Sequence, residues 1–346
     1  MRWGPGLVAV AILALAPLLF SDFYLSAVIT KALWLGIAAV SLVFLAGYVG
    51  MISLGQVALY GIAGFTMANL VAADGGSKIA LNPWIATLVG LVAATVVGLF
   101  LGVIAGRSYG IYFLMITLAF AVLVYFFFAQ VTQLSGFGGI NNVARPDVVG
   151  NPLQQPTRLF YIALGLSLII YAFLRYLART PLGLAFQGVR DEPLRMRALG
   201  YNVLLLRALA FGLGALIAAF AGVLSVWWNT RISPGSIALP QTLDILVIAV
   251  IGGLYRLEGA WVGAVVFAVL DNWIRGVELV GGRFNTVVGA IFLAIVLLSP
   301  GGLMGIWESV TGALRHRLGR GPRGEEPQPV PLTEERHPAS GTPIVP

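Results

Sequence analysis

The chain has 346 residues, of which 59% are hydrophobic and only 10% charged, and its formal net charge is +7. Soluble domains carry about 25% charged residues, so this composition excludes an ordinary soluble protein and is typical of a polytopic membrane protein. There is no cysteine, and the only histidines, His316 and His337, lie near the C-terminus. We therefore expect no disulfide, no metal site and no catalytic residues in the membrane part, and the positive charge does not require a nucleic-acid partner.

Apolar stretches long enough for transmembrane helices recur along the chain, and we predict about ten of them. The first follows Arg2 and could be mistaken for a signal peptide, but no convincing cleavage site follows it, so we interpret it as a short helix. The stretch 241–254 is short for a full crossing and is expected to be broken or steeply packed. The predicted spans are 7–20, 25–46, 53–73, 83–104, 110–133, 159–177, 208–228, 241–254, 259–275 and 284–299. The expected fold is all-α and polytopic, with some helices short or broken by glycine.

The distribution of positive charge predicts the orientation of the chain. With the N-terminus inside, the inner segments hold fourteen Lys and Arg residues and the outer segments hold six. Cytoplasmic loops carry the excess of Lys and Arg in membrane proteins, so both termini are expected to be cytoplasmic. We predict a transmembrane permease domain over 1–307 and a basic, proline-rich, largely disordered cytoplasmic tail over 308–346.

Glycine is abundant, with 43 residues. Spacings such as those of Gly61 with Gly64 and Gly259 with Gly263 favour close packing of helices. The dense clusters at 47–64 and 251–264 also permit unwound backbone beside a cavity. The outer loop 134–158, rich in Gly, Asn and Pro, is interpreted either as a surface for an external partner or as a cap on the bundle.

The segment 178–207 is the one long charged stretch between apolar spans. Its arginines and its helically spaced apolar residues suit docking onto a cytoplasmic protein, although a solvated connector held inside by its charge explains the composition about as well. The candidate docking residues are Arg179, Gly183, Arg190, Asp191, Glu192, Arg195, Arg197, Ala198 and Gly200.

The sequence lacks the residues that several kinds of chemistry require. A phosphate-binding P-loop needs Gly-Lys-Ser/Thr, and neither Lys31 nor Lys78 follows a glycine, so any ATP site must belong to a separate subunit. No Ser–His–Asp set is present, which argues against an enzyme. An ion-coupled carrier needs buried ionisable groups, and only Asp271 among the carboxylates is placed to lie deep. Transport driven by a partner is therefore favoured over ion coupling.

Four blocks of sequence, in order, resemble a known family. They are GYVGMISLGQ at 47–56, GIYFLMITLAF at 110–120, LGYN at 199–202 with the helix after it, and a glycine-rich block closed by PGGL at 300–303. Together they resemble the LivM-like permease subunit of the branched-chain amino-acid class of bacterial ABC importers. The family's Glu-x-x-Ala-Ala-like run is interrupted here by Pro193. Because proline is tolerated best in a first helical turn, the coupling helix is expected to begin near Pro193.

The resemblance implies a function and a set of partners. A LivH-like second permease would complete the pathway, two ABC ATPase subunits would use ATP and Mg, and a periplasmic binding protein would deliver branched-chain or related amino acids across the bacterial inner membrane. This chain would bind no cofactor itself. Permeases of the same build for urea, short amides or aromatic compounds, an autonomous ion-coupled carrier, and a scaffold without transport are the alternatives. The pathway candidates are Gly47, Tyr48, Gly50, Ser53, Gly55, Gln56 and Thr117.

Overall fold

The computed structural model describes residues 13, 15–19, 21–71, 80–150, 155–275, 289, 290, 293 and 302–305. All of them belong to the compact unit Met1–Trp307. Within these ranges the fold is helical, without strands, and one isolated antiparallel bridge joins Ile140 to Ile232. The predicted tail 308–346 lies outside the described residues, as do most of the predicted spans 7–20 and 284–299.

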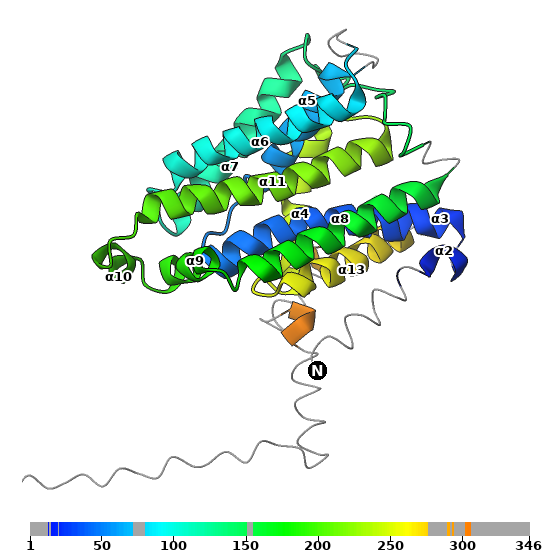
Figure 1. Cartoon of the computed structure of the whole chain (residues 1–346). Coiled ribbons are helices and arrows are strands. Elements are labelled where there is room, and N and C mark those ends of the chain that lie inside the picture. The colour runs from blue at the N-terminus through cyan, green and yellow to red at the C-terminus, as the bar shows by residue number, and fades with distance from the viewer. Residues whose placement is uncertain are drawn as a thin grey trace, which may run out of the picture. The chain divides into compact units, whose positions relative to one another are not determined.

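Most helices follow one another with short connections, and a long loop joins α7 to α8 (Figure 1). A π-helical turn η1 (Leu25–Thr30) runs into α4 (Lys31–Phe44) and a second π-helical turn η2 (Leu45–Val49), so Leu25–Val49 is one continuous element. The short helices α2 (Ala16–Leu19) and α3 (Asp22–Tyr24) precede it. The others are α5 (Gln56–Leu70), α6 (Pro83–Ala105), α7 (Ile111–Gln130), α8 (Pro156–Leu177), α9 (Pro181–Asp191), α10 (Pro193–Ala198), α11 (Val203–Asn229), the 3₁₀ turn η3 (Pro234–Ile237), α12 (Leu239–Gly252) and α13 (Leu257–Arg275).

Helix starts are encoded locally. Proline occupies the first turn of α6, α8, α9, α10 and α12, where its missing N–H costs nothing. The side chains of Asn82, Thr180 and Asn202 accept hydrogen bonds from the first-turn backbone N–H groups of α6, α9 and α11. Such caps stabilise a helix by about 1 kcal/mol each, so the polar residues between apolar stretches define where these helices begin.

Within the described residues, five helical elements are long and apolar enough to cross a membrane: Leu25–Val49, Pro83–Ala105, Ile111–Gln130, Pro156–Leu177 and Val203–Asn229. A sixth crossing results if α12 and α13, bent by 117° at their junction, count together. The predicted spans 53–73 and 241–254 correspond to α5 and α12, with 15 and 14 residues. At a rise of about 1.5 Å per residue neither reaches the roughly 30 Å of a hydrocarbon core by itself. The structure thus establishes a helical, multi-pass fold with fewer full-length spans in its described part than the ten predicted.

The helices form two groups that meet along α4 and α11 (Figure 1). One group contains α5, α6, α7 and α11, and the other α4, α8, α12 and α13. Burial differs sharply across the bundle, because 94% of the apolar stretch of Leu25–Val49 is buried, against 28% of that of α7. α4 is therefore the central helix, whereas α6 and α7 present large apolar side chains outward, as expected of helices that face lipid.

Small residues make the tightest helix contacts, as the glycine spacings predicted. A Cβ on Gly98 of α6 would lie 2.2 Å from the Cβ of Ala215 in α11. In the bend between α12 and α13, a Cβ on Gly263 would lie 2.1 Å from the carbonyl oxygen of Ile248, and Gly259 meets Gly252 as closely. Any larger residue would force these helices apart, so the cluster at 251–264 serves helix packing as well as the bend.

Candidate functional site

The charged 178–207 segment folds into two short helices, α9 and α10, between the end of α8 and the start of α11 (Figure 1). The expected start of a helix at Pro193 is confirmed, since α10 begins there. α10 ends at Ala198, and Gly200 in the turn that follows has a φ of +87°, which suits glycine. Met196 is the one buried side chain of α10, and its sulfur packs against Gly188 of α9. The two helices thus form one small unit.

α9 is built into the bundle. Its apolar face is buried, with Phe186 fully inaccessible and in edge-to-face contact with Phe44 of α4, with ring centroids 6.2 Å apart. At its first turn the backbone N–H of Gly183 donates to Thr180 Oγ1 at 3.3 Å. A Cβ on Gly183 would lie 2.0 Å from the carbonyl oxygen of Leu177. Gly183 is therefore a packing residue that lets α9 fold back against the end of α8.

Arg190, at the end of α9, reaches back into its own chain. Its Nη1 donates to the carbonyl oxygen of Gly47, in the π-helical turn that ends α4. Its Nε donates to Asp191 Oδ1 at 2.7 Å, and this guanidinium holds the pKa of the Asp191 carboxyl below its usual value. Gly50 lies directly against Arg190, because a Cβ there would be 2.8 Å from Arg190 Cγ. The sequence grouped Arg190 with the docking residues, and in the structure this exposed side chain also bonds its own chain at Gly47.

A non-helical segment over 50–55 separates η2 from α5. Gly50 begins it with φ +72°, a left-handed conformation that favours glycine. The backbone N–H of Leu54 donates to Thr117 Oγ1 of α7 at 3.2 Å, and that of Gly55 donates to Ser53 Oγ at 3.1 Å. The glycine-rich block therefore does produce a helix break, and the break is held by hydroxyl groups from the same block and from α7.

The predicted pathway residues lie close together, but most of their polar groups bond or pack against other parts of the same chain. Ser53 and Thr117 are fully buried, and their hydroxyls bond backbone groups. Tyr48 is half-buried and packs against Phe44. Only Gln56, the first residue of α5 and 2% exposed, has an amide whose oxygen and nitrogen find no hydrogen-bond partner among the described residues. In this conformation the Ser53 hydroxyl accepts a hydrogen bond from the Gly55 N–H, and Gln56 keeps an unsatisfied amide.

The remaining docking candidates face outward. Arg179, Glu192, Arg195, Ala198 and Gly200 are exposed, and the side-chain charges of Arg179, Glu192 and Arg195 make no ion pair within the described ranges. Beside them Leu194 is 73% and Leu199 66% exposed. Arg197 differs, since its Nη2 donates to the hydroxyl of Tyr109 at 2.8 Å. α10 therefore displays apolar and basic side chains on one small surface.

One contact at this end could not be read from the sequence. Arg207, in the first turns of α11, lies over the ring of Tyr109, with its guanidinium carbon 3.9 Å from the ring centroid. Tyr109 belongs to the turn between α6 and α7, far from Arg207 in sequence. No motif links these residues, and only the packing of α11 beside α6 brings them together.

The charged groups considered for ion coupling have partners. Lys31 Nζ of α4 forms a salt bridge with Asp271 Oδ2 of α13. Glu258 Oε1 accepts from Tyr171 at 2.6 Å and pairs with Arg175 at 3.2 Å, both on α8. A carboxylate paired with a cation in this way is neutralised as a structural link, so the geometry gives Asp271 a packing role between α4 and α13.

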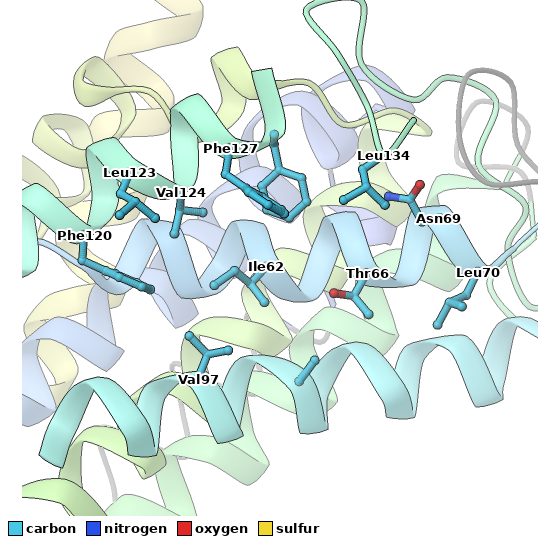
Figure 2. A pocket seen from close by; sticks show the side chains of 12 residues that line it. Ile62, Thr66, Asn69, Leu70, Val97, Phe120, Leu123, Val124, Phe127 and Leu134 are labelled. Carbon is cyan, nitrogen blue, oxygen red and sulfur yellow. The ribbon is translucent and has the colours of Figure 1, made fainter. Parts of the chain in front are cut away.

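A cavity of about 560 Å³ lies between α5, α6 and α7. Figure 2 shows branched and aromatic side chains from all three helices pointing into it. Its two polar residues are Thr66 and Asn69, and Asn69 Nδ2 donates to the carbonyl oxygen of Phe65 at 2.9 Å. The lining holds no charge to match an amino acid's carboxylate or ammonium group. It consists of Ile62, Thr66, Asn69, Leu70, Ala93, Val97, Phe120, Leu123, Val124, Phe127, Phe128 and Leu134.

The loop after α7 is anchored to the turn after α11. The isolated bridge between Ile140 and Ile232 and a hydrogen bond from the Val143 N–H to the carbonyl oxygen of Thr230, at 2.9 Å, fix its course. Arg145 Nη1 donates to the carbonyl oxygen of Trp227 at 3.4 Å, and burial lowers the pKa of this guanidinium. The loop therefore covers the end of the bundle opposite α9 and α10, and its role toward an external partner stays a prediction.

These features define the class of protein. Long apolar helices packed closely through glycine make it a multi-pass membrane protein. A family model described as the permease component of the branched-chain amino acid transport system matches residues 24–299. The chain therefore belongs to this permease family, and the resemblance found in the sequence is confirmed.

Individual relatives agree with the family. The chain is 26% identical over 287 residues to the high-affinity branched-chain amino acid transport system permease protein LivM of Salmonella typhimurium, covering 75% of this chain and 64% of the relative. LivM of Escherichia coli K12 is 24% identical, with the same coverage. The autoinducer 2 import system permease protein LsrC of Escherichia coli is 31% identical over 125 residues, 35% of each chain. The chain thus spans just under two thirds of the length of the LivM permeases. No solved structure matches it.

Proposed function

We propose that this chain is a permease subunit of an ATP-driven ABC importer in the bacterial inner membrane. It would form the pathway with a second, LivH-like permease and carry branched-chain or related amino acids delivered by a periplasmic binding protein. ATP and Mg would be used by two separate ATPase subunits. Family membership supports the transport role, and the similarity to LivM permeases of branched-chain amino acid transport supports this solute class.

The observation that carries the proposal is the surface of α10. Leu194 and Leu199 are exposed although both are large and apolar, and Arg195 lies beside Leu194 without an intramolecular partner in the described chain. Exposed apolar residues rimmed by charge mark interaction surfaces. An apolar groove with a carboxylate at its rim, on an ATPase subunit, would complement this surface.

The connection from α10 to the helix bundle supports energy coupling. Met196 holds α10 on α9, Phe186 holds α9 on α4, and Arg190 holds the carbonyl group of Gly47 at the end of α4. Movement of α10 by a docked ATPase would therefore act on the break before α5. Because Gln56 starts α5 beside that break with an unsatisfied amide, we propose that the amide bonds solute when the break opens.

The test is reconstitution of the full chain with its candidate partner permease and ATPase in proteoliposomes. Leu194→Asp combined with Arg195→Glu should abolish ATPase co-purification and ATP-dependent leucine uptake. Arg158→Glu reverses the charge of an exposed arginine in the first turn of α8; it serves as the control and should retain both. Uptake by the permease without any ATPase would overturn the proposal and favour an autonomous carrier.

A permease for a different solute is the second candidate. The match to permeases named for autoinducer 2 import indicates that related chains serve solutes other than amino acids. Competition of leucine uptake by urea, short amides or aromatic compounds in the same proteoliposomes separates the two. Uptake of one of these compounds in preference to leucine would assign the chain to that class while leaving the ATP-driven mechanism intact.

A further inference from the structure

Two arginines from different parts of the chain converge on Tyr109. Arg207 of α11 stacks over its ring at 3.9 Å, and Arg197 of α10 donates to its hydroxyl at 2.8 Å. Tyr109 lies in the turn between α6 and α7, and Arg107, also exposed, belongs to the same turn. Three positive charges therefore occupy the end of the bundle where α6 finishes and α7 begins.

These charges lack a carboxylate partner within the described residues. None of Arg107, Arg197 and Arg207 forms a salt bridge there. Arg207 is only 5% exposed, and its Nη1 bonds the carbonyl oxygens of Gly106 at 3.1 Å and Ser108 at 3.5 Å, while its Nε has no partner. A buried charge is costly unless it is paired, so this site is suited to an added anion.

A small cavity of about 120 Å³ adjoins the buried guanidinium. Its lining combines Arg207 and Tyr109 with the helix break before α5 and the first turns of α7. This volume is well below the roughly 300 Å³ at which pockets for whole small-molecule ligands begin, so it suits one small group such as a phosphate. The lining residues are Gly50, Met51, Ile52, Ser108, Tyr109, Gly110, Phe113, Leu114 and Arg207.

The surface beside the arginines is apolar. On α6, Phe100 and Ile104 are exposed, and on α7, Ile111, Tyr112 and Met115 are exposed, with Tyr112 71% accessible. Tyrosine is enriched where a membrane meets water, and the aliphatic side chains farther along both helices match hydrocarbon. A ligand that combines an anionic group with long apolar chains would satisfy both parts of this surface.

We propose that this end of α6 and α7 binds an anionic phospholipid of the bilayer. Its phosphate would lie against Arg197 and Arg207, and its acyl chains would follow the exposed faces of α6 and α7. The charge distribution of the sequence predicts that this end faces the cytoplasm, and the cytoplasmic leaflet is the one enriched in anionic lipid. The contact between Arg197 and Tyr109 would then give the lipid a link to α10.

The experiment measures lipid retained by the full-length protein. Nanodiscs of phosphatidylcholine with a minor fraction of phosphatidylglycerol are prepared, and the protein is released into detergent and analysed by native mass spectrometry. Wild type should retain phosphatidylglycerol above its bulk fraction. Arg197→Gln should reduce retention about five-fold, the effect of one basic side chain near an anionic membrane surface. Tyr109→Phe, which keeps the ring under Arg207 but loses the hydroxyl, should give a smaller loss.

The matched control is Arg195→Gln, two residues away on the same short helix and exposed without a partner among the described side chains. It should lower lipid retention clearly less than Arg197→Gln does, because it removes the same surface charge but not the link to Tyr109. Equal losses in the two variants, or equal retention of phosphatidylcholine and phosphatidylglycerol by wild type, would overturn the proposal. Unchanged lipid retention in Arg197→Gln together with lost ATPase co-purification would also overturn it, because the arginines would then bind the protein partner. If the chain recruits no ATPase but still binds the lipid, this inference holds although the proposed function fails.

Discussion

The two helices of the 178–207 segment have nearly opposite surroundings although they adjoin in sequence. α9 buries Phe186 and Val189, and its Arg190 bonds the carbonyl oxygen of Gly47. α10 buries only Met196 and displays Leu194 and Leu199. The difference shows that a charged loop need not act as one unit: one helix belongs to the fold, and the other is available to a partner. Substitutions in α9 should therefore change the stability of the chain, whereas those in α10 should change binding.

The largest effect is expected for Phe186→Ala. The ring is fully buried against Phe44, and truncation of a buried phenylalanine costs about 3–5 kcal/mol. We expect a lower unfolding temperature in detergent and rapid proteolysis of the 178–207 segment. Leu184→Ala, on the exposed side of the same helix, is the control and should change stability by less than about 0.5 kcal/mol. Equal effects of the two substitutions would mean that α9 is not docked as described.

Arg190→Met comes next, because it removes the hydrogen bond to the carbonyl group of Gly47 but keeps the apolar part of the side chain. Hydrogen bonds to charged groups contribute about 1.5–3 kcal/mol. We expect a reduced unfolding temperature and, in the reconstituted importer, ATPase activity that no longer drives uptake. Retained ATPase binding distinguishes this outcome from loss of the docking surface. Unchanged coupling would remove Arg190 from the connection between α9 and the break before α5.

Gly50→Ala tests the same connection from the other side. Its φ of +72° costs a non-glycine residue about 1–2 kcal/mol, and the added Cβ would displace the Arg190 side chain. Gly165→Ala is the matched control, since Gly165 lies within α8 with open space around it, and alanine there should stabilise the helix by about 0.5–1 kcal/mol. In a double-mutant cycle, Gly50→Ala and Arg190→Met should be non-additive because the two residues touch.

Sequence patterns predicted the local features of this site and not its contacts. Pro193 marked the start of α10, and the glycines at 47–55 marked a helix break, because both depend on backbone preferences of the residues themselves. The contact of Arg190 with Gly47 and the ion pair of Lys31 with Asp271 join residues far apart in sequence. Their positions depend on how α4 packs against α9 and α13, which hydropathy does not encode. The spans divide in the same way: the short apolar stretch 241–254 already predicted that α12 does not cross alone, whereas the predicted span 53–73 did not reveal that α5 is also too short.

The smallest effect on stability, and the clearest on binding, is expected for Leu199→Ser. The side chain is 66% exposed and lies one residue beyond α10. Its replacement should therefore change the free energy of unfolding by less than about 0.5 kcal/mol, as exposed substitutions usually do. If α10 and Leu199 insert into an apolar groove of the ATPase, Leu199→Ser removes the burial of one leucine side chain. ATPase binding should then weaken by about 1.5–3 kcal/mol, which is more than ten-fold. Titration of the ATPase onto nanodisc-embedded wild type and variant measures this ratio. A large loss of stability with unchanged affinity would reverse the assignment of the two helices, making α10 a part of the fold and leaving the partner to bind elsewhere.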